Sequence, residues 1–244
     1  MTRAAGGLLA LALTLALAGC ETTAEQSARL EREAARGGAS AARGGGLSIA
    51  RESRLVEVVQ ETVLHSPEGS AVVLRLRNRS GTALRDVPLA VTVRDARGAV
   101  LYTNSTPGLA RTLVSAPLLG AHGELTWIDD QVQGAGAPVS VSAKVGEAPA
   151  FSGPIPRIAV EGAHLVEDPS NGLGAEGTVA NRSGVVQREL VVYALAERAG
   201  RIVAAGRAVL AQAPAGASTR FQVFFIGDPR GARLRFDAPA STLR

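Results

Sequence analysis

The sequence predicts an all-β protein built as two tandem antiparallel β-sandwiches. Short segments alternate apolar and polar residues with a period of two, which is typical of strands. Turn-forming residues separate these segments about every 8–12 residues, and no segment shows an amphipathic helical pattern. The tetrapeptide Asn78-Arg79-Ser80-Gly81 recurs 103 residues later as Asn181-Arg182-Ser183-Gly184. This recurrence indicates two copies of one domain.

The first copy is predicted at residues 47–148. Its expected strands lie at residues 54–64, 71–77, 87–95, 99–102, 123–128 and 138–145. In the second of these strands, Val72, Leu74 and Leu76 share one face, whereas Arg75 and Arg77 share the other. Such alternation predicts a half-buried strand with one face toward solvent. Because Pro88 cannot donate a ladder hydrogen bond, its strand is expected to lie at a sheet edge there.

The second copy is predicted at residues 157–244, after a linker at 149–156 that is rich in proline and glycine. Its expected strands lie at residues 157–166, 175–180, 190–197, 201–206, 216–223 and 232–236. If the copies are equivalent, Asn78 and Asn181 occupy the same turn, because asparagine suits a turn at a strand end. Gly81 and Gly184 are then expected to supply a positive φ. We also expect a substitution at either glycine to destabilise only its own copy.

The N-terminus carries an export signal. Arg3 precedes an apolar run from Leu8 to Leu17, which has signal-peptide length and is too short to span a bilayer. The run ends in Leu17-Ala18-Gly19-Cys20, and Cys20 is the only cysteine of the chain. This segment resembles the bacterial lipobox, whose cysteine is modified with diacylglycerol before the peptide is cleaved in front of it.

The lipobox resemblance implies a signal peptide at residues 1–19 and an extracytoplasmic mature chain that is lipid-anchored through Cys20. Two or three acyl chains hold a protein firmly on a membrane. Glu21 follows the cysteine where inner-membrane lipoproteins usually have aspartate, which favours the outer membrane if the organism is Gram-negative. The alternative is an ordinary secretory signal with an incidental cysteine.

Residues 20–46 are predicted to form a flexible tether. They are mostly small or polar and include the glycine runs at 37–38 and 44–46. A flexible chain of this length has a root-mean-square reach of about 28 Å. That reach would lift the folded part clear of the lipid headgroups.

A second resemblance concerns the repeated domain. Gly177-Thr178-Val179-Ala180-Asn181, followed by Tyr193-Ala194-Leu195-Ala196-Glu197, is similar to the motif of bacterial FxLYD-type domains. The first copy offers Val91-Thr92-Val93-Arg94-Asp95 at the corresponding place, and both copies depart from the aromatic positions of the motif. The resemblance implies an immunoglobulin-like β-sandwich of a kind found in exported lipoproteins, mostly without assigned activity.

Composition and motifs argue against several function classes. A single cysteine precludes an intramolecular disulfide, and the three histidines lack metal-ligand spacing. The formal charge is +4, but Lys144 is the only lysine, and the arginines are scattered among acidic residues. No nucleophile, zinc or phosphate-loop motif occurs. We therefore expect no catalytic residues, no metal, no cofactor and no nucleic-acid partner.

Three places in the sequence are candidate chemical sites. Asp129 and Asp130 beside Trp127 could bind a cation, but adjacent residues point to opposite strand faces or mark a turn. His164, with Glu167 nearby, is interpreted as a histidine on a strand surface. Phe224 has the opposite parity to Phe221, Val223 and Phe225, so it is the candidate partner contact if it faces outward.

The predicted function is that of a membrane-anchored, non-enzymatic interaction or assembly module at the cell envelope, with an envelope protein as partner. One alternative is a lipoprotein that binds a small molecule between its two domains, near Phe151 and the proline-rich join. Another is a hydrolase built on His122 or His164 with Asp129.

Overall fold

The computed structural model describes residues 28–29, 32, 47–134, 136–168 and 172–243. The predicted signal peptide, Cys20 and almost all of the predicted tether lie outside these residues. The described chain consists mostly of strands, and every strand pair is antiparallel, which confirms the all-β fold class and its sandwich character. Within these ranges, no helix is both long and apolar enough to cross a bilayer.

The first half contains two sheets. One has the order β1-β2-β6, from β1 (Val56–Ser66), β2 (Gly69–Asn78) and β6 (Glu124–Asp129). The other is centred on β3 (Ala83–Arg94). Its partners are β4 (Val100–Thr103), β5 (Ser115–Leu119), β7 (Ser140–Val145) and β8 (Ala150–Phe151).

Pro88 lies inside this second sheet, so the expectation of an edge strand there is wrong. The pairing of β3 with β5 ends at Pro88, and its pairing with β7 begins at Leu89. The proline thus marks the point where β3 changes neighbours. Its missing N–H interrupts no continuous ladder.

The second half repeats this plan. Its sheets have the orders β13-β10-β9 and β14-β12-β11-β15. The strands are β9 (Ile158–Asp168), β10 (Gly172–Asn181), β11 (Gln187–Arg198), β12 (Arg201–Ala213), β13 (Ser218–Phe224), β14 (Ile226–Gly227) and β15 (Arg233–Asp237). By pairing pattern, β9, β10 and β13 correspond to β1, β2 and β6, while β11 and β15 correspond to β3 and β7.

The halves differ in the strand that follows β3 in the first half and β11 in the second. In the second half, β12 runs unbroken along β11. In the first half, the corresponding chain is divided into β4, the short helix α2 (Arg111–Val114) and β5. Asn104, fully buried, bridges the break, because its Oδ1 accepts from the Val91 N–H at 2.7 Å and its Nδ2 donates to the Leu89 carbonyl at 2.8 Å.

The two asparagine turns are equivalent, as expected. The Nδ2 of Asn78 donates to the Thr82 carbonyl at 2.7 Å, and the Nδ2 of Asn181 donates to the Val185 carbonyl at 2.8 Å. In each turn, the Oδ1 accepts from the backbone N–H two residues later, at 2.9 and 3.1 Å. Each side chain therefore closes the turn that ends β2 or β10.

The expectation about the turn glycines is wrong. Neither Gly81 nor Gly184 has a positive φ. Because the asparagine side chains close these turns, no left-handed residue is needed there. Asp86 and Glu189, at corresponding places of the two halves, are left-handed, with φ values of 53° and 48°, as are His122 and Ala199.

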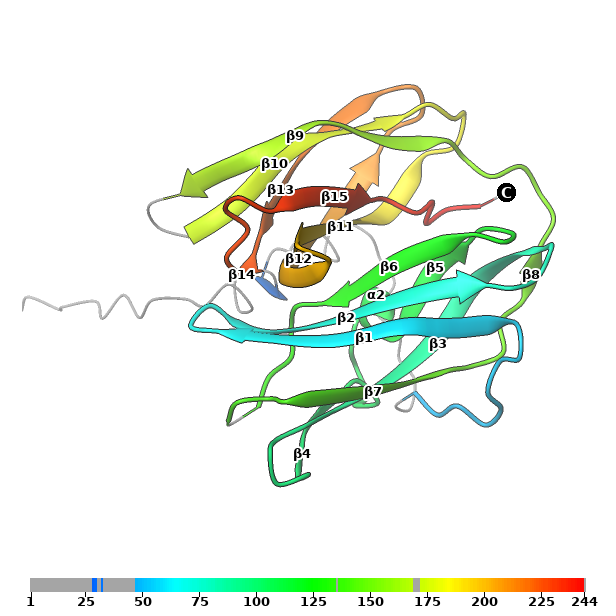
Figure 1. Ribbon diagram of the computed structural model, residues 1–244. Helices are drawn as coiled ribbons and strands as arrows, with labels where there is room; N and C mark the ends of the chain where they lie inside the picture. Colours follow the sequence, from blue (N-terminus) through cyan, green and yellow to red (C-terminus); the bar gives the residue numbers. More distant parts are fainter. Residues whose placement is uncertain (1–27, 30–31, 33–46, 135, 169–171, 244) are drawn as a thin grey trace, which may run out of the picture.

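The four sheets are stacked as layers, and the two halves share a core (Figure 1). Along β11, Leu190, Val192 and Ala194 pack within the second half, whereas Val191 and Tyr193 join the core cluster of the first half. The solvent-facing side expected for β2 is therefore covered at Arg75, whereas Arg77 on the same side is exposed as expected. Arg75 on that side forms an ion pair with Glu197 at 2.6 Å.

Candidate functional site

A buried polar cluster joins the two halves. Arg207 of β12 donates through Nε to Oδ1 of Asp130 at 3.0 Å, and the two side chains are 0% and 1% exposed. The neighbouring Asp129 turns to another partner, since its Oδ2 accepts from the Tyr102 hydroxyl at 2.7 Å. The two aspartates thus diverge, as the sequence indicates for adjacent residues.

The electrostatics of this cluster follow from its burial. Burial raises the pKa of Asp129 to about 6, although the positive charge of Arg207 and the hydrogen bond from Tyr102 act in the opposite direction. Burial, and then the charge of Asp129, raise the pKa of Tyr102. Within the described ranges, no group of three or more histidine, cysteine, aspartate and glutamate residues could hold a metal ion. We interpret the cluster as a buried polar contact that stabilises the interface between the halves.

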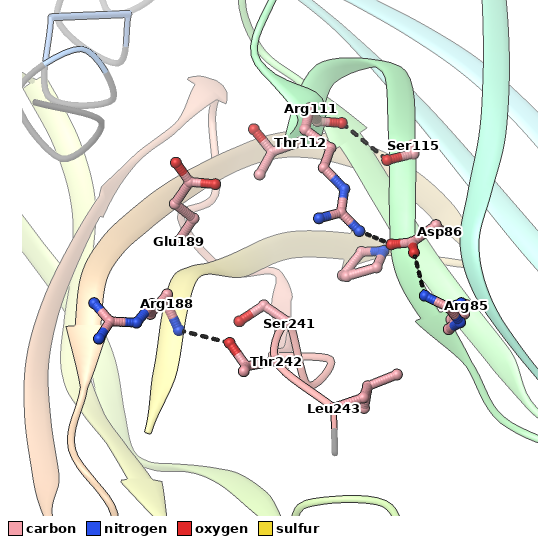
Figure 2. A pocket seen from close by; sticks show the side chains of 11 residues that line it. Arg85, Asp86, Arg111, Thr112, Ser115, Arg188, Glu189, Ser241, Thr242 and Leu243 are labelled. Atoms are coloured by element: carbon pink, nitrogen blue, oxygen red, sulfur yellow. Dashed lines mark hydrogen bonds and ion pairs between the residues drawn. The ribbon is translucent and has the colours of Figure 1, made fainter. Parts of the chain in front are cut away.

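A cleft of about 350 Å³ opens between the two halves (Figure 2). Its first-half wall comes from the start of β3, α2 and β5, and its second-half wall from the start of β11 and the C-terminal segment. The lining residues are Arg85, Asp86, Arg111, Thr112, Ser115, Pro117, Arg188, Glu189, Ser241, Thr242 and Leu243.

Equivalent backbone irregularities place one acidic residue of each half in the cleft. The register of β3 with β5 and of β11 with β12 is unbroken across Asp86 and Glu189, but neither residue is itself paired. Both residues have the left-handed conformation described above, which is uncommon for residues other than glycine.

The cleft holds charges of both signs. Asp86 accepts a hydrogen bond from Arg85 at 3.3 Å and forms an ion pair with Arg111. In contrast, the Glu189 carboxylate and the Arg188 guanidinium form no ion pair within the described part of the chain. Figure 2 shows Arg111 and Asp86 on one wall and Glu189 on the other.

The C-terminal wall of the cleft is held by Gln187, whose side chain is buried. Its Oε1 accepts from the backbone N–H groups of Ser241 and Thr242 at 2.9 and 3.0 Å. Its Nε2 donates to the Thr242 carbonyl at 3.2 Å. These bonds fix two hydroxyl side chains beside the charged groups, an arrangement suited to hydrogen-bonding a small polar molecule.

The candidate residues from the sequence are not brought together here. Phe224 does not meet the condition for a partner contact, which was that it faces outward, because it is only 5% exposed. Glycines at 174 and 206 let neighbouring chain segments approach it closely. Phe151 packs with Ala83 and Leu118 outside the cleft lining.

The histidines are exposed in separate places. His164 lies on β9 with its Nδ1 at 3.0 Å from the Gly162 carbonyl, and His122 lies in the turn before β6. Asp129, the third member of the hydrolase hypothesis, is buried and bonded to Tyr102.

Sequence reasoning missed Arg207 and Gln187. The sequence did contain an indication that Arg207 is buried and paired. It is the single charged residue in the small-residue segment 204–209 of a strand. A charge in such a segment is expected to be paired when it is buried. Gln187 had no signal, since its partners lie 54 and 55 residues away.

Comparisons with known proteins do not name a family. No protein-family model matches the chain, and no curated protein matches it in sequence. Among solved structures, the chain is similar to the exo-beta-D-glucosaminidase CsxA, with 15% identity and a TM-score of 0.26 over 73% of this chain. The match covers 25% of the enzyme chain, so this protein spans about a quarter of that length. A similarity of this size assigns neither a fold family nor an activity.

Proposed function

We propose that this protein is a membrane-anchored extracytoplasmic lipoprotein that acts as a non-enzymatic interaction or assembly module at the cell envelope. The observation that carries the proposal is Leu17-Ala18-Gly19-Cys20, which puts the only cysteine directly after an apolar run of signal-peptide length. The lipid on Cys20 is the proposed membrane contact. We propose the outer membrane if the organism is Gram-negative, because Glu21 follows the cysteine.

The folded part supports a role in display or assembly. Its halves share one core and a buried Arg207–Asp130 pair, so it offers a partner a single rigid surface. The hydrolase hypothesis has no support, because its histidines lie apart and Asp129 is engaged by Tyr102. We further propose that each half is an immunoglobulin-like, FxLYD-like domain, on the strength of the repeated motif and the equivalent asparagine turns.

Metabolic labelling tests the anchor. Radioactive palmitate supplied to the native host should label the wild-type protein and fail to label the Cys20→Ala variant. Labelling of that variant, or an unlabelled wild type, would contradict the proposal. Crosslinking in intact envelopes then tests whether the protein has a partner. We expect the chain to be crosslinked to one defined envelope protein.

The cleft supports a second candidate function, the binding of a small polar molecule between the halves. The supporting observation is that Glu189, whose carboxylate forms no ion pair within the described chain, lines the same cleft as the hydroxyls of Ser241 and Thr242. A thermal-shift screen with envelope metabolites should find a ligand that raises the melting temperature. The shift should be lost in Glu189→Gln and kept in a Glu176→Gln control on β10, away from the cleft. A screen without such a ligand would reject this candidate.

A further inference from the structure

One end of the molecule is also the place where the predicted tether enters the fold. Strands β1, β9 and β11 begin there and β2 and β10 end there, at the right of Figure 1. The chain that follows the predicted tether is fixed at the same end. Ser53 donates its N–H to the Val145 carbonyl at 2.8 Å, and Glu52 bridges Gly146. We call this the tether end and define it by residues 47–55, 79–82, 120–123, 146–157 and 182–189.

The tether end carries three arginines without an ion-pair partner in the described residues. Arg51, Arg79 and Arg182 form ion pairs with Glu147, Glu57 and Glu161. Arg54, Arg157 and Arg188 form none within the described chain, and the acidic residue of this end that is likewise unpaired there is Glu189.

Free guanidiniums and exposed aliphatic side chains alternate at the tether end. Leu55, Ile155 and Val186 are 47%, 45% and 37% exposed. Each lies within two residues of an arginine, at position 54, 157 or 188. No side-chain hydrogen bond or ion pair joins these three guanidiniums to the described part of the chain. Basic groups interspersed with aliphatic ones suit the headgroup region of an anionic bilayer.

We infer that the tether end docks on an anionic lipid surface, with the three arginines on headgroup phosphates and the three aliphatic side chains at the acyl boundary. The inference rests on the proposed lipid anchor at Cys20. The predicted tether, with its expected reach of about 28 Å, would allow the body both to contact and to leave the membrane. Anchoring also gives this end a high effective concentration at the surface, so weak individual contacts suffice. Docking then holds the opposite end away from the bilayer.

The test uses the full-length protein acylated in its native host and placed in vesicles. Because acylation consumes the thiol of Cys20, Leu55→Cys provides a single reactive thiol for a fluorescent label. Val100→Cys provides the matched label on β4, at an exposed position outside the tether end. With phosphatidylglycerol vesicles that carry a headgroup-region quencher, the label at position 55 should be quenched and the label at position 100 should not. Vesicles of phosphatidylcholine alone should quench neither.

Charge variants supply the control. Replacing Arg54, Arg157 and Arg188 with glutamine should lower the ratio of docked to undocked protein about 100-fold, since each arginine near an anionic surface contributes a factor of about five. The same change at Arg97, Arg201 and Arg233, which are equally free of side-chain partners in the described chain, should leave docking intact. Equal quenching at both labels, or quenching that the first triple variant retains, would overturn the inference.

Failure of the anchor is distinguishable from failure of docking. An unlabelled protein in the palmitate experiment would contradict the proposed anchor alone. A protein that is acylated and vesicle-bound, but whose label at position 55 is never quenched, would overturn docking and leave the anchor standing.

Discussion

At the scale of single residues, Asp130 and Arg207 govern the contact between the two halves. Both side chains are buried, and they meet across the interface at 3.0 Å. Removing one partner leaves the other charge buried and uncompensated, which typically costs 3–5 kcal/mol, whereas replacing both with apolar residues of similar volume is often tolerated. We therefore expect Asp130→Ala to lower the free energy of unfolding by about 4 kcal/mol. The double variant Asp130→Leu, Arg207→Met should lose much less.

Urea denaturation of the two single variants and the double variant measures this coupling. Single-variant losses that simply add in the double variant would show that the two charges do not stabilise one another.

Asp129 gives the stability a pH dependence. Its pKa is raised by burial from 3.8 to about 6, so the unfolded chain releases this proton first as the pH rises. The native state loses relative stability over this window, by about 2 kcal/mol between pH 4 and pH 6. Asp129→Asn cannot titrate. The free energy of unfolding of the wild type should therefore fall, relative to that of the variant, as the pH rises from 4 to 6.

A matched control is Asp228→Asn on the surface. Hydrogen bonds from Arg230 lower the pKa of Asp228 to about 2, so this residue stays ionised across the same window. The difference in stability between the wild type and Asp228→Asn should therefore be flat from pH 4 to pH 6. If the difference in stability between the wild type and Asp129→Asn were also flat over this window, the raised pKa of Asp129 would be contradicted.

At the scale of elements, one glycine permits the second sandwich to close. A Cβ at Gly206 of β12 would lie 2.0 Å from the Phe224 carbonyl oxygen of β13, so the backbone would have to shift to admit it. Gly206→Ala should therefore destabilise the protein by about 3 kcal/mol or more, through forced backbone shifts. Gly184→Ala is the control, because nothing lies within 4 Å of its Cβ and its φ is not left-handed. Thermal denaturation should show little change for Gly184→Ala, and equal losses in both variants would refute the argument.

Most strands could be predicted from alternation, but their surroundings could not. The strands expected at 54–64 and 157–166 are observed as β1 and β9, shifted by only one or two residues. Alternation places the side of β2 that carries Arg75 and Arg77 in solvent, because it shows only where the polar residues fall. Arg77 is exposed, but Arg75 is covered by the second half, where Glu197 is its partner. The uninterrupted apolar run from Leu190 to Ala196 was the sign of a strand buried on both faces.

The candidate cleft could not be predicted, because it depends on contacts that are distant in sequence. Its walls join the start of β3 to the C-terminal segment through the bonds of Gln187. The interdomain location was anticipated, but Phe151 was the wrong marker, since it packs against Ala83 and Leu118. α2 and β5 were also missed, because the chain between β4 and β5 follows neither period.

At the scale of the whole molecule, the shared core predicts a single cooperative unfolding transition. This replaces the expectation that each copy unfolds alone, because Val191 and Tyr193 of the second half are part of the core cluster of the first. If the second half unfolded, the apolar surface of the first half that these two residues cover would be exposed. The charge of Asp130 would also lose its partner Arg207. Neither half then has a stable state without the other.

The only tryptophan makes this prediction testable. Trp127 is buried in β6 of the first half, so its fluorescence reports that half, whereas circular dichroism reports the strands of both. Gly206→Ala acts in the second half, and its destabilisation should still move the Trp127 transition to lower urea concentration by the same amount as the circular dichroism transition. Coincidence of the two probes is the test of two-state unfolding. A Trp127 transition that stays at its wild-type midpoint, while the circular dichroism curve splits, would show that the interface does not couple the halves.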